Sequence, residues 1–389
     1  MHGFIRTSGS FAALALLASA AHGIDQTVVE LAPPDSIEVP IVLLVDLRSG
    51  QTLLEKEATR RFMPASITKV MSAFVAFEMI EAGELNERQQ FVFRPESAEK
   101  WRSVGSTMFL DAGESVPVWL LLRGITSVSA NDASIVLAEG ATGSVEAWTE
   151  RMNAEARRLG MNDSHFNTPN GWMDEGRTFT SARDLERLAR AIITRHPEKY
   201  ARYFGQIGLE HKGIAQPNHD PITGKVRGAD GIKTGFTNEA GFGFLGSAER
   251  NGTRLVLVVA GADRARARDK LSRELIEWGF AAFDRQLLYL ADQVVAEAKV
   301  QDGSRRHVDL VPAAPIHVAV LRGSNPDISM RLKYDGPIRA PFDEGDEIAE
   351  LELTVAGMPT SRIPLVARQT VDEANAFERI WNGVAGWFS

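Results

Sequence analysis

One helical segment, residues 66–80, most constrains how this chain can fold. Between Ser66 and Ile80, apolar residues occupy nearly every face of the predicted helix, which ends near Gly83. A helix that is apolar all round is buried by other elements. The chain has 389 residues, enough for about two domains and a large core. We therefore expect an α+β fold that encloses this helix.

The strands predicted on either side of this helix fit one sheet. Five short segments with strand character are separated by turn signals. They are residues 39–47, 51–54, 231–237, 241–247 and 254–260. The dipeptide Asn251-Gly252, typical of tight hairpins, joins the last two. We expect a five-stranded antiparallel sheet, covered by a helix over residues 268–285.

Between the two groups of strands, residues 116–191 are mostly helical in period. Helices are predicted at residues 145–159 and 182–193, with loops at residues 124–131 and 162–176. This part of the chain is expected to form an all-helical lobe.

The last hundred residues change character. Residues 290–368 consist of short β segments, and in residues 351–355 every second side chain is apolar. They predict a small β-rich domain. Residues 370–389 return to a helical period with an apolar stripe that includes Trp381 and Trp387. This amphipathic helix is expected either to lie on a membrane surface or to pack on its own domain.

The N-terminus has the features of a secretory signal peptide. His2 and Arg6 precede an apolar run at residues 11–20, and small residues at Ala18-Ser19-Ala20 suit signal peptidase, so residues 1–23 are expected to be removed. The alternative is an uncleaved anchor, although the run is shorter than the roughly 20 residues of a bilayer span. Either form places the domains outside the cytoplasm, and a secreted chain without cysteine suits a bacterial periplasm.

Composition excludes several classes of function. The 43 basic and 51 acidic residues give a net charge of -8 without a basic block, which argues against a nucleic-acid partner. With no cysteine there is no disulfide, thiolate metal site or cysteine nucleophile. The eight histidines are scattered and form no His-Glu-x-x-His motif, so we expect neither a metal nor a cofactor.

Three short polar motifs carry the candidate chemistry. In chain order they are Ser66-Ile-Thr-Lys69, Ser129-Ala-Asn131 and Lys233-Thr-Gly235. Each alone is weak evidence, since a Ser-x-x-Lys occurs by chance about once in a chain of this length. Together they are informative, because they fall at a buried helix start, in a loop between helices and on a strand, as their chemistry requires.

Ser66 and Lys69 form a candidate nucleophile and base. Residues three apart on a helix face the same way, and burial in an apolar helix makes an ammonium lose its proton more easily. Lys69 can then take the proton of Ser66. The structural alternative is an N-cap serine followed by a surface lysine.

The other two motifs supply relay and binding groups. The Ser129 hydroxyl could pass the proton to the leaving group, and the Asn131 amide could hold the acyl part of a substrate, although both residues could also cap the next helix. Lys233, with the hydroxyls of Thr234 and Thr237, could bind a carboxylate, whereas the structural alternative for this lysine is a solvated edge position.

Gly235 supports the binding interpretation. A glycine within a strand marks the close approach of another backbone, such as a peptide substrate lying beside the edge strand.

The motifs and their surroundings resemble the low-molecular-mass penicillin-binding proteins, which are serine D-alanyl-D-alanine carboxypeptidases of the penicillin-recognising family. The matching stretches are Pro64-Ala-Ser-Ile-Thr-Lys69, Ser129-Ala-Asn-Asp-Ala133, Asp230-Gly-Ile-Lys-Thr-Gly235 and Trp278-Gly-Phe280. The resemblance implies a β-lactamase/transpeptidase-like catalytic domain over residues 30–285. It also implies attachment to the periplasmic face of the inner membrane through the last helix.

The resemblance also implies roles for single residues. Ser66 is acylated by peptidoglycan stem peptides that end in D-Ala-D-Ala, or by β-lactams, and D-alanine leaves. The backbone N–H groups of Ser66 and Phe236 form the oxyanion hole, and Arg268 helps Lys233 to bind the terminal carboxylate. Phe236 stands where many relatives have histidine, and residues 216–219 differ from the Asn-Arg-Asn-Gly run expected there.

Three rival functions follow from the same pocket. A class A β-lactamase needs a Glu-x-x-Leu-Asn segment after the Ser-x-Asn loop, and the chain has none there. An endopeptidase that cuts peptide cross-links would use the same chemistry with a more open carboxylate subsite, and Lys233 with Arg268 favours a free carboxylate. A penicillin-sensing or wall-binding module would keep the pocket without turnover.

Overall fold

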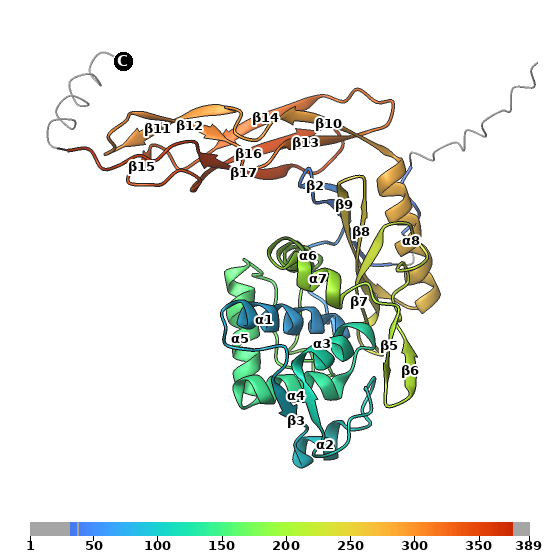
Figure 1. Ribbon diagram of the computed structural model, residues 1–389. Coiled ribbons are helices and arrows are strands. Elements are labelled where there is room, and N and C mark those ends of the chain that lie inside the picture. The colour runs from blue at the N-terminus through green and yellow to red at the C-terminus, as the bar shows by residue number, and fades with distance from the viewer. Residues whose placement is uncertain (1–31, 37–38, 376–389) are drawn as a thin grey trace, which may run out of the picture.

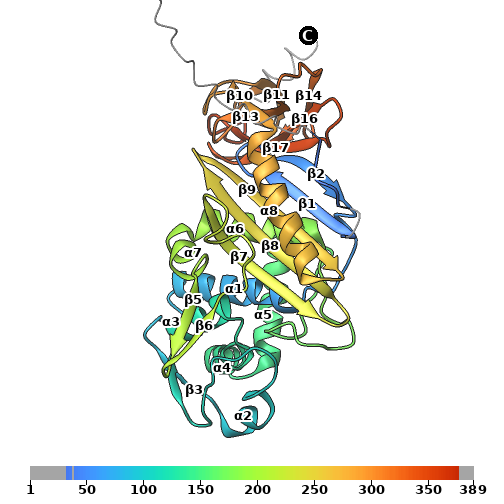
Figure 2. The same cartoon turned by 90° about the vertical axis from the view of Figure 1, so that its right-hand side faces the viewer.

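The computed structural model describes residues 32–36 and 39–375 (Figure 1). The predicted signal peptide and residues 376–389 of the predicted terminal helix lie outside the described residues. The chain forms a body of sheet and helices, and an elongated β-rich body lies across one end of it (Figures 1 and 2). Among the helices of the described part, none has the length and apolar character needed to cross a membrane.

The predicted five-stranded antiparallel sheet is confirmed. Its strands, in spatial order, are β2 (Gln51–Lys56), β1 (Ile41–Asp46), β9 (Thr253–Ala262), β8 (Gly241–Arg250) and β7 (Ala229–Thr237). Asn251 and Gly252 form the turn between β8 and β9, and both have positive φ angles, as a two-residue hairpin turn needs.

The sheet is buried on both faces, which explains why β1 is apolar from Ile41 to Val45. Leu43 points into the core shared with the helical lobe, and Leu44 points into the core under α8 (Ala265–Ala281), which crosses the other face (Figure 2). The helix predicted for residues 268–285 therefore ends earlier than expected, because the chain enters strand β10 (Phe283–Tyr289) directly.

The helical lobe surrounds α1 as the apolar sequence requires. Its helices are η1 (Ala65–Thr68), α1 (Lys69–Glu81), α2 (Pro95–Trp101), α3 (Val118–Ser127), α4 (Asn131–Thr142), α5 (Val145–Arg158), α6 (Ala182–Arg195) and α7 (Pro197–Tyr203). The lobe also holds two small antiparallel ribbons that the sequence pattern did not predict. They are β3 (Gln90–Val92) with β4 (Ser115–Pro117), and β5 (Gly208–His211) with β6 (Ile214–Pro217).

The loop predicted at residues 124–131 is shorter than expected. Helix α3 continues to Ser127, so Gly124 lies inside a helix. A Cβ atom at Gly124 would lie 2.6 Å from the sulfur of Met108. This glycine therefore reflects close packing and not a turn.

The β-rich body is a separate set of strands, as predicted. It contains β10, β11 (Ala296–Gln301), β12 (His307–Val311), β13 (Ile316–Leu321), β14 (Ile328–Lys333), β15 (Ile338–Arg339), β16 (Glu347–Val355) and β17 (Ser361–Ala367). Because β10 pairs with β13, this body begins before the expected residue 290. Val371 and Glu373 form bridges to Phe342 and Gly303, so the helix does not start at residue 370 as predicted.

The two bodies meet through buried polar contacts. The carboxylate of Asp46, at the end of β1, accepts a hydrogen bond from Arg285 Nε at 2.7 Å, and Asp46 is fully buried. Gln51 of β2 donates to the carbonyl oxygen of Ala319 at 3.1 Å and accepts from its N–H. Satisfied buried polar groups of this kind fix the mutual orientation of the two bodies.

Strand β7 lies against the η1 turn, and Gly235 makes this contact possible. A Cβ atom at Gly235 would overlap the carbonyl oxygen of Pro64 and would lie 3.0 Å from Ile67. The close backbone approach that the sequence predicts at Gly235 is thus an approach within the protein. It fixes the distance between the sheet edge and Ser66 in η1.

We predict that Gly235→Ala lowers the free energy of unfolding by about 1–3 kcal/mol, because backbone atoms of η1 must move. Gly243, directly opposite on β8, is a matched control. There a Cβ atom would meet only the flexible end of Ile67 at 3.3 Å and the Val259 carbonyl at 3.4 Å. Chemical denaturation should show a smaller loss for Gly243→Ala, and equal losses would contradict this account.

Candidate active site

The three sequence motifs meet at one pocket between the sheet edge and the helical lobe. The pocket has a volume of about 590 Å³. Its lining includes Ser66, Ser129, Asn131, Thr234, Gly235, Phe236, Thr237 and Arg268. Lys69 and Lys233 are buried behind this lining. All ten residues singled out from the sequence are therefore at this pocket or directly beneath it.

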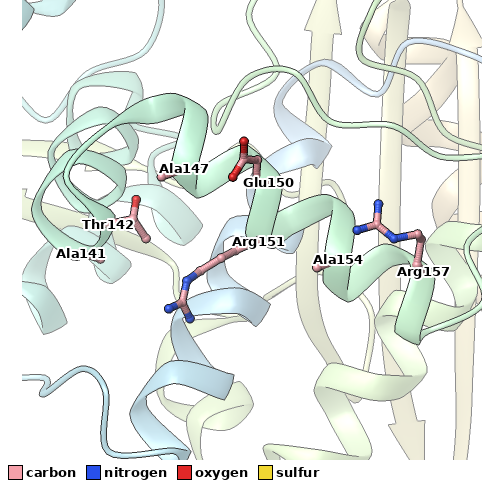
Figure 3. Close-up of a pocket in the computed structure, with 7 residues that line it drawn as sticks. All are labelled: Ala141, Thr142, Ala147, Glu150, Arg151, Ala154 and Arg157. Carbon is pink, nitrogen blue, oxygen red and sulfur yellow. The ribbon is translucent and has the colours of Figure 1, made fainter.

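A second depression, of about 790 Å³, lies along the outer face of α5 (Figure 3). Figure 3 shows the small side chains of Ala147 and Ala154 on the same helix as Glu150, Arg151 and Arg157. Arg151 is paired with Glu84 at 2.7 Å. This shallow, charged surface brings no nucleophile and base together, so we place the chemistry at the first pocket.

Ser66 and Lys69 form a direct hydrogen-bonded pair. The sequence pattern predicts both in the first turn of one helix, but Ser66 lies in the 3-10 turn η1 and α1 begins only at Lys69. The spacing of three still brings Lys69 Nζ to 2.9 Å from Ser66 Oγ. The residue before the serine, Ala65, has a left-handed φ of 47°, which is uncommon for a residue with a side chain.

The lysine amine is held by two groups that can only accept hydrogen bonds. Lys69 Nζ donates to Asn131 Oδ1 at 2.8 Å and to the carbonyl oxygen of Asn170 at 2.8 Å. A neutral amine has two N–H donors and one lone pair. When these acceptors take both N–H groups, the lone pair of Lys69 is left facing the Ser66 hydroxyl.

The surroundings favour this neutral form. Lys69 is 1% exposed, and burial, with a further contribution from the charge of Lys233, lowers its pKa well below the usual range for lysine. The carboxylate of Asp132 acts in the opposite direction. Asp132 accepts hydrogen bonds from the backbone N–H groups of Met108 and Leu110, which ties the loop before α3 to the start of α4.

Asn131 lines the pocket, and each end of its amide makes a contact within the protein. Its carbonyl oxygen faces Lys69, and its Nδ2 donates to the Val104 carbonyl oxygen at 2.9 Å. The Nδ2 group has a second N–H, so the expected role of this amide in holding the substrate stays a prediction. Ser129 lines the pocket, is buried and has a left-handed φ of 63°. Left-handed residues of this kind often occur at functional sites.

The opposite end of the pocket is cationic. Lys233 is buried, and burial together with the nearby Arg268 lowers its pKa to about 7, although Asp220 opposes the shift. Its Nζ donates to the Thr234 carbonyl oxygen at 3.0 Å. Arg268, from α8, is paired with Asp269 at 2.7 Å and also donates to the Gly243 carbonyl oxygen. This end suits a carboxylate ligand.

Aromatic side chains form part of the pocket wall. Phe236 and Phe242 lie opposite each other on β7 and β8, and their rings stack with centroids 4.1 Å apart. Phe236 is 48% exposed, so the pair presents an apolar surface beside the cationic end. The Thr237 hydroxyl accepts a hydrogen bond from the N–H of Ala240 and so shapes the turn into β8.

Sequence reasoning missed several residues that the fold brings to this pocket. They are Gly105, Ser106, Asn170, Trp172, Met173 and His219. No local pattern shows that the loop at residues 162–176, although predicted, passes beside Lys69. The departure from the expected run at residues 216–219 was the available signal for His219.

Within the described residues, no group of three or more histidine and acidic side chains is arranged to hold a metal ion. The groups brought together at Ser66 are a hydroxyl, an amine, amides and cations. These groups can supply a nucleophile and a base for acyl transfer.

Two family models match the chain. The model of peptidase family S11, described as D-alanyl-D-alanine carboxypeptidase, matches residues 27–264. The model described as the C-terminal domain of penicillin-binding protein 5 matches residues 283–373.

Known proteins match over nearly the whole chain. The D-alanyl-D-alanine carboxypeptidase DacA of Escherichia coli strain K12 is 30% identical, over 93% of this chain and 91% of its own length. The structure of penicillin-binding protein 5 from Haemophilus influenzae is 30% identical, with a TM-score of 0.73 over 88% of this chain and 100% of that chain. Ampicillin-bound penicillin-binding protein D2 from Listeria monocytogenes is 28% identical, with a TM-score of 0.58 over 64% of this chain and 100% of that chain.

The hydrogen-bonded pair of Ser66 and Lys69, the cationic pocket end and the two-body architecture agree with these matches. The chain belongs to the D-alanyl-D-alanine carboxypeptidase family of serine peptidases.

Proposed function

We propose that this protein removes the terminal D-alanine from peptidoglycan stem peptides through an acyl-enzyme on Ser66. The observation that carries this proposal is the hydrogen bonding of Lys69, whose two acceptors leave its lone pair facing Ser66 Oγ. The cationic end, with Lys233 and Arg268, adds a reason for a substrate with a free C-terminal carboxylate.

Acylation follows from these positions. Ser66 Oγ attacks the carbonyl carbon of the penultimate D-alanine while Lys69 takes its proton. The backbone N–H groups of Ser66 and Phe236 stabilise the oxyanion. The C–N bond then breaks, and the amine of the terminal D-alanine receives a proton from Lys69, relayed by the Ser129 hydroxyl. An ester between the shortened peptide and Ser66 remains.

Deacylation uses the same groups in the reverse direction. Once D-alanine has left, water can approach the ester carbonyl, and the amine of Lys69 takes its proton. The C–O bond of the ester breaks and the proton returns to Ser66 Oγ. A β-lactam forms the same ester, but its leaving nitrogen stays attached to the acyl group. The ampicillin-bound relative supports β-lactams as inhibitors of this chain.

Replacement of Lys69 by arginine separates its role as base from its charge. Arginine keeps the positive charge but is not deprotonated in proteins. We expect Lys69→Arg to lower the acylation rate by a labelled penicillin by about a thousandfold, within the range of general-base effects. Ser66→Ala should abolish labelling.

Two further measurements identify the labelled residue and test turnover. Peptide mapping of the wild-type adduct should place the label on Ser66, and a label elsewhere contradicts the mechanism. D-alanine release from a pentapeptide tests turnover. Penicillin labelling without cleavage of any peptide would indicate a sensing module, and cleavage of cross-linked peptides without D-alanine release from the pentapeptide would indicate an endopeptidase.

The two lysines act in opposite protonation states, which predicts a bell-shaped pH profile of kcat/KM. Activity should rise with pH as Lys69 loses its proton, and should fall above pH about 7 as Lys233 loses the charge that binds the carboxylate. Lys233→Arg keeps a cation throughout this range, so its alkaline fall should move up by more than one pH unit. An unchanged alkaline limb in this variant would reject the role of Lys233.

The proposed substrate lies outside the cytoplasm, so we further propose export and attachment to the inner membrane through the terminal helix. N-terminal sequencing of the mature protein should show loss of residues 1–23. Deletion of residues 376–389 should move the protein from the membrane fraction to the soluble periplasmic fraction. An intact Met1 or unchanged membrane association contradicts the respective part of this proposal.

A further inference from the structure

His219 lines the same pocket as Ser66, Thr234 and Arg268 but has no part in the mechanism above. We propose that His219 is a specificity-determining residue, which donates a hydrogen bond to the free C-terminal carboxylate of the peptide. This inference rests on the function proposed above and concerns how the enzyme selects a free chain end.

The backbone on both sides of His219 is firmly held. Asn218 donates from its N–H to the Ile207 carbonyl oxygen and from Nδ2 to the Gln206 carbonyl oxygen, both at 2.8 Å. Asp220 is buried and accepts from the N–H of Ile222 at 2.8 Å. His219 is therefore presented to the pocket from a fixed position, which reduces the entropy lost when a ligand binds.

The imidazole itself is left available. In the described part of the chain, no hydrogen-bond partner of the His219 ring is found, although its neighbours Asn218 and Asp220 are both engaged. The side chain is exposed at the pocket rim. A polar group with this freedom beside a cationic pocket can take a ligand oxygen without breaking an internal contact.

The charged groups around His219 favour an anionic ligand. Lys233 on β7 and Arg268 on α8 both face it, and partial burial with these two cations lowers its pKa. Two carboxylates adjoin these residues in the sequence, and both have partners: Asp220 accepts a hydrogen bond from Thr223, and Asp269 is paired with Arg268.

At neutral pH the ring is thus a neutral N–H donor, and a carboxylate in this corner would meet two cations and one directional donor. A C-terminal amide carries no charge, and a hydrogen bond to its neutral carbonyl oxygen is weaker than one to a carboxylate, so the amide would gain less from His219. We therefore expect His219 to control the preference of the enzyme for a peptide with a C-terminal carboxylate over the same peptide with a C-terminal amide.

The test compares an acyl-D-Ala-D-Ala peptide with its C-terminal amide. His219→Leu, which removes the donor at similar size, should raise KM for the acid about tenfold with kcat near the wild-type value. KM for the amide should change less than twofold. His219→Asn, which keeps an N–H donor, should recover part of the acid preference.

His307→Leu serves as the matched control, since His307 is an exposed histidine on β12 in the other body. It should leave both substrates unaffected. Equal changes for acid and amide, a fall in kcat alone, or an unchanged KM in His219→Leu would overturn the inference. If the wild-type enzyme released neither D-alanine from the acid nor D-alaninamide from the amide, the proposed function itself would fail, a result that differs from all of these.

Discussion

The site depends on one constraint: the amine of Lys69 must be shielded from solvent and must donate hydrogen bonds to two acceptors. The apolar surface of α1 and the lobe around it remove water from this amine. Asn131 from α4 and Asn170 from a long loop then take its N–H groups. Three segments far apart in the sequence must therefore converge, which requires the whole lobe to be folded before Ser66 has a base.

The two buried lysines show how the same residue type can serve opposite tasks. In the proposed mechanism Lys69 acts without its proton and Lys233 with it, yet both are buried. Their neighbours differ. Asp220 supports the charge of Lys233, whereas Lys233 itself opposes the charge of Lys69. Binding of an anionic substrate would raise the pKa of Lys233 and so favour its charged form. Because the charge of Lys233 acts on Lys69, the substrate and the proposed base are electrostatically coupled.

The sequence predicted those features that depend on residues close together in the chain. The five strands followed from turn signals such as Asn251-Gly252, and the nucleophile and base followed from a spacing of three. The errors arose where tertiary contacts decide. Gly124 was taken as a loop residue, but it lies inside α3, where Met108 leaves no room for a Cβ atom, and α8 ended early because β10 pairs with β13. Asn170 was missed because it acts through its backbone, which any residue could supply.

The position of the β-rich body follows from the sheet. β2 and β7 are its opposite edges, and the β-rich body contacts β2 through Gln51 whereas the pocket lies along β7. Between them, the sheet is buried on both faces and behaves as one rigid layer. The attachment at Asp46 and Arg285 therefore holds the catalytic body at a fixed angle without occupying the edge where a peptide would lie. The contacts that orient the β-rich body thus lie at β1 and β2, on the side of the sheet away from the pocket at β7.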